Sequence, residues 1–284
     1  MFSLILENEN GEQIVFNRLY SPYQLTDITG LAAPEATINT NASALIDGAT
    51  YNSAKTNMRV INLAFAIEYE AAKYRNEIYR ILRIKKPVKV RYRNDYRDVF
   101  IDGYLQTLDI PPMTIKQICT VAILCPAPYF KAAQEMVNEL EQTISTFHFP
   151  FSSTEEPQIV FGYIDTESSV SIENAGNVET GMTISLYARG AVNNPKIYNY
   201  TTGEYIELNY SLEAGDLVTI TTGQGNKTAK LLRNAVESNL FNYIGEGTTW
   251  LQLLPGINEF VYTAGSGATS LSVTISHYDL YEGV

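Results

Sequence analysis

The sequence predicts a mainly β protein: an α+β first half with one helix, followed by an all-β second half folded as a sandwich. The 284 residues include 20 Tyr and 18 Gly, a composition that favours pleated strands and turns. Apolar residues recur at every second position through most of the chain, and one stretch of the first half changes to a helical period. A chain of this length can bury two separate cores.

The first half begins with two short strands, Phe2–Leu6 and Gln13–Phe16, on either side of a turn sequence. Tyr23–Leu31 shows no regular period and is expected to be irregular. Arg59–Tyr69 alternates, and one of its two faces is apolar throughout, which predicts a strand with one buried face. The residues of that face are Ile61, Leu63, Phe65, Ile67 and Tyr69.

A helix is expected over Glu70–Arg83, where apolar residues at i, i+4, i+7 and i+8 from Tyr74 form one stripe. The sequence Lys85–Pro87 ends it, with basic charge near the negative end of the helix dipole. Strands are then predicted at Val88–Tyr92 and Val99–Leu105.

The next predicted strand, Thr114–Leu124, leads to the second of only two cysteines, Cys119 and Cys125. Six residues of straight strand separate two α-carbons by about 20 Å, and a disulfide requires less than about 7 Å. We therefore expect two small buried thiols.

A polar segment closed by proline, residues 141–157, is predicted to link a first domain, 1–140, to a second domain, 158–284. A short helix at Ala132–Leu140 is expected to lead into it. Many short strands separated by turn signals, with no room for crossover helices, then predict an antiparallel sandwich. These strands are Ile159–Ile164, Ser169–Glu173, Met182–Ala188, Lys196–Tyr200, Tyr205–Tyr210, Leu217–Thr221, Lys227–Leu232, Trp250–Leu253, Asn258–Tyr262 and Leu271–His277.

The net charge of −11 is unevenly distributed. Residues 1–150 carry 15 Lys+Arg and 16 Asp+Glu, whereas residues 151–284 carry 5 and 15. The acidic second half argues against sequence-specific nucleic-acid binding. No apolar run approaches the roughly 20 residues of a membrane helix, and the N-terminus lacks the features of a signal peptide. We therefore expect no membrane partner, and folding in a cytoplasm.

Catalytic motifs are sparse. The two histidines, His148 and His277, lie far from either cysteine, and no zinc-binding motif or nucleophile elbow is present. We therefore expect no enzyme activity, no metal and no cofactor. The acidic pairs Glu155–Glu156 and Asp165–Glu167 are of the kind that glycosidases use, but they fall in predicted turns, so a cell-wall glycosidase is the weakest of the functional alternatives.

The segment Lys73–Arg97 holds ten of the twenty basic residues but only two acidic ones, Glu77 and Asp95. Two interpretations stay open: the solvated face of a helix and a strand, or a cationic surface that meets an acidic partner or lines a channel that nucleic acid crosses. The candidate interface or channel residues are Arg80, Arg83, Lys85, Lys86, Lys89, Arg91, Arg93 and Arg97.

Aromatic residues of the second half also allow two interpretations. They stack on sugar rings if they line a face of the sandwich, or they pack as core and cross-strand pairs, which is the more common case. The residues concerned are Tyr198, Tyr200, Tyr205, Tyr210 and Trp250, and Trp250 is the candidate carbohydrate contact.

Several short strings occur along the chain in an order that is more specific than any one of them. In the first half they are Gly30–Pro34, Arg59–Phe65, Arg75–Leu82, Arg97–Leu105 and Cys125–Phe130. In the second half they are Ile172–Asn177, Asn194–Asn199, Thr202–Glu204, Gly215–Ile220, Leu253–Phe260 and Tyr281–Val284. Over nearly its full length the chain thereby resembles the distal tail (Dit) proteins of long-tailed phages that infect Gram-positive bacteria.

The resemblance implies an N-terminal belt domain with a helix and a projecting hairpin, which assembles as a hexameric ring, and a galectin-like or carbohydrate-module-like sandwich outside it. It implies a structural protein of the virion tail tip, or baseplate, assembled in the host cytoplasm. Its partners would be further copies of itself, the tail tube protein, the tail-associated hub or lysin protein, and a receptor-binding protein. An infectious phage, a prophage or a tail-like bacteriocin particle would each carry such a chain.

The galectin sugar site departs from the family pattern here, because neither histidine begins an H-x-N-x-R strand. Fold analogy alone therefore gives no sugar site, and the outer domain is expected to be a docking surface. The alternative function is a host cell-wall carbohydrate-binding adhesin module.

Overall fold

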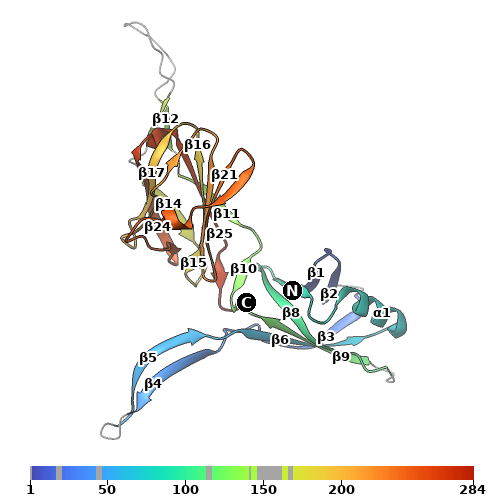
Figure 1. Ribbon diagram of the computed structural model, residues 1–284. Coiled ribbons are helices and arrows are strands. Elements are labelled where there is room, and N and C mark those ends of the chain that lie inside the picture. The colour runs from blue at the N-terminus through green and yellow to red at the C-terminus, as the bar shows by residue number, and fades with distance from the viewer. Residues whose placement is uncertain are drawn as a thin grey trace. The chain divides into compact units, whose positions relative to one another are not determined.

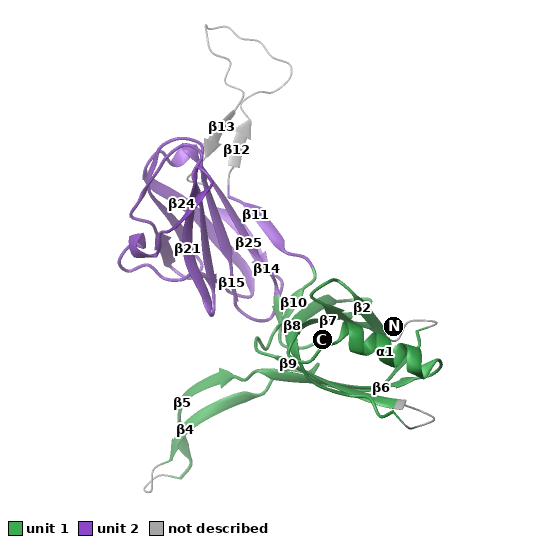
Figure 2. Cartoon of the chain, turned by 45° about the vertical axis from the view of Figure 1, so that its right-hand side comes forward, with its two compact units in different colours: residues 1–133, 280–284 green, residues 134–279 purple. Residues whose placement is uncertain are grey.

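The computed structural model describes residues 2–16, 21–42, 47–112, 117–140, 142–145, 162–165 and 169–284. The chain forms two compact units: unit 1 contains Met1–Ala133 and Leu280–Val284, and unit 2 contains Gln134–Asp279 (Figure 2).

These bounds differ from the predicted domains, 1–140 and 158–284, because strand pairing decides them. β11 (Met136–Glu139) pairs with β25 (Leu271–His277) and so belongs to unit 2. β26 (Leu280–Tyr281) returns to pair with β10 (Phe130–Ala132) in unit 1. Most of the predicted linker, 141–157, lies outside the described residues, as does His148.

The described residues of unit 1 form a nine-stranded antiparallel sheet and one helix, α1 (Ala71–Ile81) (Figure 1). The strands follow the order β2-β1-β7-β8-β9-β6-β3, and β10 pairs with both β8 and β26. Their bounds are β1 Ser3–Asn8, β2 Gln13–Phe16, β3 Tyr23–Thr29, β6 Arg59–Ile67, β7 Pro87–Arg93, β8 Asp98–Asp109 and β9 Gln117–Cys125. The predicted β1–β2 pair, the helix and the strands β7 and β8 are thus confirmed. The predicted strand Arg59–Tyr69 is confirmed as β6, except that it ends at Ile67 and that Tyr69, expected on the buried face, is exposed.

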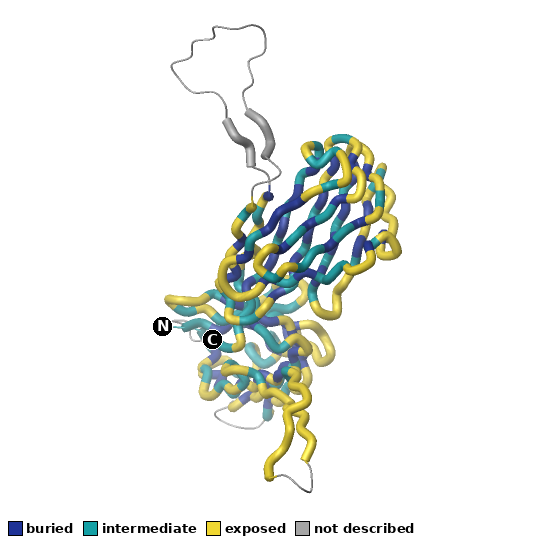
Figure 3. The backbone as a smooth tube through the Cα atoms, turned by 90° about the vertical axis from the view of Figure 1, so that its left-hand side faces the viewer, coloured by how far each residue is buried: buried dark blue, intermediate teal, exposed yellow. Residues whose placement is uncertain are grey.

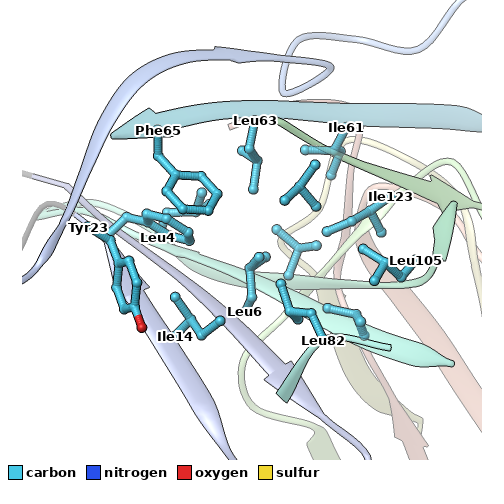
Figure 4. Close-up of a cluster of buried hydrophobic side chains, with 14 of the residues drawn as sticks. Leu4, Leu6, Ile14, Tyr23, Ile61, Leu63, Phe65, Leu82, Leu105 and Ile123 are labelled. Carbon is cyan, nitrogen blue, oxygen red and sulfur yellow. The ribbon is translucent and has the colours of Figure 1, made fainter. Parts of the chain in front are cut away.

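The sheet curves until its two end strands meet. The Phe16 ring of β2 lies 6.0 Å from the Tyr23 ring of β3 and 5.0 Å from the Phe65 ring of β6. The face that points inward is therefore closed off as a core, shown in Figure 4, and the alternate residues of each strand point outward. Ile78 and Ile81 of α1 complete this core, as the helical stripe predicted.

The expectation of irregular structure at Tyr23–Leu31 is wrong. Residues 23–29 form β3, which pairs with β6 across a bulge between Leu25 and Asp27. A bulge inserts one extra residue and reverses the alternation of faces. The period-two pattern is therefore interrupted in the sequence although the strand continues.

Two further strands of unit 1, β4 (Ala36–Ala42) and β5 (Ala49–Thr56), form a separate antiparallel hairpin that extends away from the curved sheet (Figure 1). No strand is predicted there from the sequence, because the apolar residues of these two strands are mostly alanine, and Ile38 and Tyr51 are the only large ones. Its path is coloured as exposed along both strands in Figure 3.

Unit 2 is a sandwich of two antiparallel sheets around one core, as predicted. One sheet has the order β11-β25-β16-β20-β21-β22, and the other has β14-β24-β17-β18 with β19 beside β17. The remaining bounds are β12 Gln142–Ser145, β13 Gly162–Asp165, β14 Val170–Asn174, β15 Thr180–Gly181, β16 Thr183–Ala188, β17 Val192–Asn199, β18 Glu204–Glu207, β19 Ser211–Leu212, β20 Leu217–Gly223, β21 Asn226–Arg233, β22 Val236–Asn239, β23 Gln252–Leu253 and β24 Gly256–Ser266, with short 3₁₀ turns η1 Phe241–Tyr243 and η2 Ala268–Ser270.

The helix predicted at Ala132–Leu140 is wrong, because residues 136–139 form β11 at the edge of the first of these sheets. Pairing with β25 satisfies the backbone groups of this short segment and overrides its weak helical pattern. The mainly β fold class is confirmed.

Candidate functional site

The basic segment Lys73–Arg97 is distributed over several elements of unit 1. Arg80 lies in the last turn of α1, residues 83–86 follow the helix, and Arg97 lies just before β8. On β7 the basic side chains point outward and alternate with inward Val88 and Val90, as predicted.

Each neighbour of β7 brings carboxylates to the same outer face. Lys89 is paired in register with Glu7 of β1 on one side and with Asp102 of β8 on the other, and its Nζ lies 4.0 Å from Glu7 Oε1. Opposite charges on adjacent strands contribute about 0.2–1 kcal/mol per pair. The positive strand β7 therefore lies between two strands that carry negative charge.

Asp98 forms the tightest of these ion pairs. Its two carboxylate oxygens accept hydrogen bonds from Nε and Nη2 of Arg91 at 2.6 Å each, and Arg93 Nε lies 3.7 Å from Oδ2. The hydrogen bond to Asp98 raises the pKa of Arg91. This bidentate geometry holds the Arg91 side chain in one orientation.

The turn between β1 and β2 brings two more carboxylates to the basic segment. Lys86 Nζ lies 3.0 Å from Glu9 Oε1, and Arg80 Nη2 lies 3.5 Å from Glu12 Oε1. In the part of the chain that the structure describes, Arg83 and Lys85 have no ion pair. The segment therefore forms a mixed-charge surface in which cations and carboxylates alternate.

A residue that the sequence did not single out, Arg59, is buried where β6 begins. Its Nη1 donates to the carbonyl oxygens of Gly30 and Ala32 at 3.0 Å each, and its Nη2 donates to that of Glu282. The guanidinium lies 4.6 Å from the centre of the Phe130 ring, and burial lowers the pKa of Arg59. The acceptors are backbone carbonyls, so no side-chain motif in the sequence predicts this contact.

Arg59 thereby holds the last residues of the chain against unit 1. Val284 N donates to Leu31 O at 3.2 Å, and Arg97 Nη1 donates to Gly283 O at 2.7 Å. A Cβ atom on Gly283 would lie 3.1 Å from Leu31 O, so the backbone approaches closely there. Residues 282–284 are an integral part of unit 1.

Neither strand of the β4–β5 hairpin contains a buried residue: every residue of β4 and β5 is exposed except the half-buried Thr56. Its largest apolar side chains, Ile38 and Tyr51, are 63% and 64% exposed. Hydrogen bonds such as that from Asn39 Nδ2 to Ser53 Oγ, at 3.0 Å, lie within the hairpin itself. An isolated two-stranded hairpin is at best marginally stable in water.

The outer face of the curved sheet also exposes apolar side chains. Val60 of β6, Leu124 of β9 and Tyr104 of β8 are paired in register and form a row across three strands. Val60 and Tyr104 are exposed, and so is Ile118 on the outer face of β9. We call Val60, Leu124 and Tyr104 the outer apolar row; Ile118 lies six positions from Leu124 along β9 and is not part of it.

In unit 2, the predicted carbohydrate contact Trp250 is half-buried against the core. It stacks on Phe241 at 5.5 Å, and Lys227 Nζ lies 5.7 Å from its ring centre. Tyr210 pairs separately with Tyr243 at 4.9 Å. Both aromatic residues thus make packing contacts, and the three other tyrosines lie together elsewhere.

The described residues hold no group of three or more His, Cys, Asp or Glu side chains that could bind a metal ion. His277 is buried, with Nε2 3.4 Å from Asp279 Oδ1. The side chains of the acidic pairs at 155–156 and 165–167 lie outside the described residues. No helix in the described part of the chain is long and apolar enough to cross a membrane.

The predicted buried thiols are confirmed. Cys119 and Cys125 both point into the core of unit 1. Burial raises the pKa of each to about 11. Thiols protonated in this way are poor nucleophiles and poor metal ligands.

Two family models match the chain, one in each unit. Residues 9–125 match a phage tail protein RIFT-related domain, and residues 175–279 match the C-terminal domain of a siphovirus-type tail component. Among curated proteins, no sequence matches.

Solved structures are similar over nearly the whole chain. The Dit protein of phage SPP1, described as a paradigm of the hub adsorption apparatus in phages that infect Gram-positive bacteria, has a TM-score of 0.68 and 10% identity, covering 98% of this chain and 99% of that one. A chain of the phage P2 baseplate in its activated conformation with Ca has 14% identity and covers 98% of both chains, but its TM-score of 0.47 is too low to support an argument. The SPP1 likeness shows the same fold.

Proposed function

Because this chain belongs to the distal tail (Dit) protein family of siphophages, we propose that it is a structural protein of the tail tip that closes into a hexameric ring. The ring would join the tail tube protein to the tail-associated hub protein and would carry the receptor-binding protein. The observation that best supports assembly is the exposure of β4 and β5, neither of which has a buried residue.

The hairpin supports assembly because its own chain gives it almost nothing to pack against. Its strands satisfy each other's hydrogen bonds but bury no apolar area, and burial supplies most of the stabilisation of a strand pair. In our proposal the hairpin packs on the neighbouring subunit of the ring. The outer edges of its strands also present unpaired backbone groups, which an ordered partner would cover.

The outer apolar row is the surface that we assign to the neighbour's hairpin. A ring of more than two subunits uses two different surfaces on each subunit, one donating and one receiving. The hairpin, with Ile38 and Tyr51 exposed, is the donating surface, and the row that contains Val60 and Tyr104 is the receiving one. Both belong to unit 1, which would form the ring.

The mixed-charge surface has a different role in this proposal. Most of its cations are paired within the subunit, so they supply little net positive potential for nucleic acid in a channel. Alternating charges instead favour one register of approach between subunits and disfavour others. Arg83 and Lys85 have neither an ion pair in the described chain nor the carbonyl and ring contacts that hold Arg97, so they are the best candidates for contacts with another protein.

No residue is assigned a catalytic role. Interfaces alone would perform the function, and unit 2 would provide docking surfaces for the receptor-binding protein. The acidic character of residues 151–284 makes a basic surface the expected complement on such a partner.

The test is the mass of the purified protein in solution, by light scattering coupled to size exclusion, with negative-stain images of the same peak. We expect a mass six times that of the 31.7 kDa chain and a ring with a central hole. The double variant Ile38→Asp/Tyr51→Asp should elute as a monomer with an unchanged circular dichroism spectrum. The matched control Val236→Asp changes an equally exposed residue of β22 in unit 2 and should leave the ring intact. A wild-type monomer at tens of micromolar would count heavily against the ring.

A further inference from the structure

The sheet β14-β24-β17-β18 of unit 2 presents three tyrosines on its outer face. Tyr198 of β17 and Tyr205 of β18 are register partners whose rings are nearly parallel, with an interplanar angle of 9° and centroids 6.3 Å apart. Tyr200, which follows β17, is inclined to Tyr198 by 60° at 4.9 Å. We call these three residues the tyrosine face.

These rings lie outside the sandwich core. None of them belongs to the buried cluster between the two sheets, which instead contains the alternate residues Ile197 and Ile206 of the same strands. Val261, the register partner of Tyr198 on β24, is also outside that cluster and yet is buried. Val261 is thus an apolar neighbour of the tyrosines that is buried on the outer face of the sheet. The Tyr200 side chain remains 61% exposed.

Polar rows flank the aromatic row on both sides. On one side, Lys196 is the register partner of Glu207, and its Nζ lies 3.5 Å from Glu207 Oε2 and 3.6 Å from the centre of the Tyr205 ring. On the other side, Glu259 accepts a hydrogen bond from Ser171 Oγ at 2.6 Å, which lowers the pKa of the Glu259 carboxyl. An ammonium and two carboxylates therefore lie within one row of the rings.

The backbone that carries Tyr200 is fixed before any ligand arrives. Tyr200 N donates to Glu259 O at 2.8 Å, and Glu259 N donates to Thr201 Oγ1 at 2.9 Å. Tyrosine has few rotatable bonds, so little conformational entropy is lost when it forms a contact. These bonds fix the backbone from which the Tyr200 ring extends beside Tyr198.

We propose that the tyrosine face is a binding site for a neutral saccharide. The apolar C–H face of a sugar would stack on the exposed ring of Tyr200 and contact Tyr198 beside it, since the Lys196 ammonium already lies over a face of the Tyr205 ring. The flanking Lys196, Glu207 and Glu259 would bind hydroxyl groups, since charged side chains make the stronger hydrogen bonds. The site lies within unit 2 of a single chain and does not depend on the ring.

Charge selects the class of saccharide. Residues 151–284 carry 15 acidic and 5 basic residues, so a polyanion such as a phosphate-rich wall polymer or a nucleic acid is repelled. The flanking charges also favour a saccharide over a protein partner, because the centre of a protein interface is depleted of charged residues. A neutral saccharide has both a C–H face, which suits the tyrosines, and hydroxyl groups, which suit the flanking charged side chains.

The experiment is native affinity electrophoresis of the full-length protein through gels that contain dextran, mannan, galactan or β-glucan, with poly(glycerol phosphate) as the anionic comparison. We expect at least one neutral polysaccharide to retard the protein. Tyr200→Ala should bind about tenfold more weakly, because one stacked ring is lost, and Tyr200→Phe, which keeps the ring, should bind much as the wild type does.

Tyr187→Ala is the matched control, because Tyr187 is 45% exposed on β16 of the opposite sheet. It should bind as the wild type does, and thermal melts should show that Tyr200→Ala stays folded. The proposal fails if no neutral polysaccharide retards the wild type, or if only poly(glycerol phosphate) does. It also fails if Tyr200→Ala binds polysaccharide as the wild type does. If that variant binds polysaccharide normally but no longer binds a tail protein, the tyrosine face is a protein-binding surface instead.

Discussion

The strand pairs β8–β9 and β4–β5 of unit 1 are both long and antiparallel, but they differ in what they bury. Inward residues of β8 and β9, such as Ile101 and Ile123, are buried in the core. β4 and β5 bury none, and their largest aliphatic side chain, Ile38, is exposed. Backbone pairing is thus common to both pairs, and only the supply of apolar side chains distinguishes a strand that stabilises its own unit from one that needs a partner.

The largest effect should come from the same substitution made in each pair. Ile123→Ala should lower the free energy of unfolding of unit 1 by about 2–5 kcal/mol, because it leaves a cavity in the core. Ile38→Ala should change it by less than about 0.5 kcal/mol in the unassembled chain. Urea unfolding followed by circular dichroism measures both.

The single tryptophan provides the internal control, because Trp250 belongs to unit 2. Its fluorescence transition should be unchanged in both variants. Equal losses of unfolding free energy from the two substitutions would show that the hairpin is packed within its own subunit, contrary to the difference between the two strand pairs.

A smaller effect is expected at Arg59, where the exposed hairpin returns to the curved sheet. Arg59→Met should cost about 2–3 kcal/mol in unit 1, since the carbonyls of Gly30, Ala32 and Glu282 lose charged hydrogen bonds. Limited proteolysis should also release the C-terminal residues sooner. Arg93→Met, at an exposed position, is the control, and an equal cost there would contradict the buried role of Arg59.

The smallest change adds a thiol to the hairpin. In Ser53→Cys, the new exposed thiol of β5 should react with iodoacetamide at pH 8 roughly two orders of magnitude faster than the native thiols. Burial raises the pKa of Cys119 and Cys125 to about 11, so little thiolate is present at pH 8 and more forms as the pH rises toward that value. Mass spectrometry of the peptides measures the extent of alkylation at each of the three cysteines. Comparable labelling of all three would contradict the burial of the native pair.

Regular alternation made parts of the fold predictable. β6 carries Ile61, Leu63 and Phe65 on one face, and those residues are buried as expected. β3 was missed because its bulge interrupts the alternation. β4 and β5 were missed because alanine supplies most of their apolar positions, so the alternation is weak. The candidate surfaces were harder still, because their members come from different strands.

The mixed-charge surface illustrates that limit. Within Lys73–Arg97 only Glu77 and Asp95 are acidic, so the sequence indicated a cationic strip. The carboxylates that pair with it come chiefly from β1, the β1–β2 turn and β8. The order of strands in the sheet brings these carboxylates next to the basic residues, and this order cannot be read from a local sequence pattern.

Features that depend on near neighbours in the chain could be predicted from the sequence: the mainly β class, the helical stripe that contains Ile78 and Ile81, and the burial of both thiols. These follow from side-chain spacing along one strand or one helix, which is set by local backbone geometry. Two contacts could not be predicted from the sequence. Arg59 donates a hydrogen bond to Glu282, 223 residues later in the chain. Tyr198, Tyr200 and Tyr205 lie together on an outer face. Such contacts depend on which strands pair and on which side of a sheet faces the core, and both result from the packing of the whole unit.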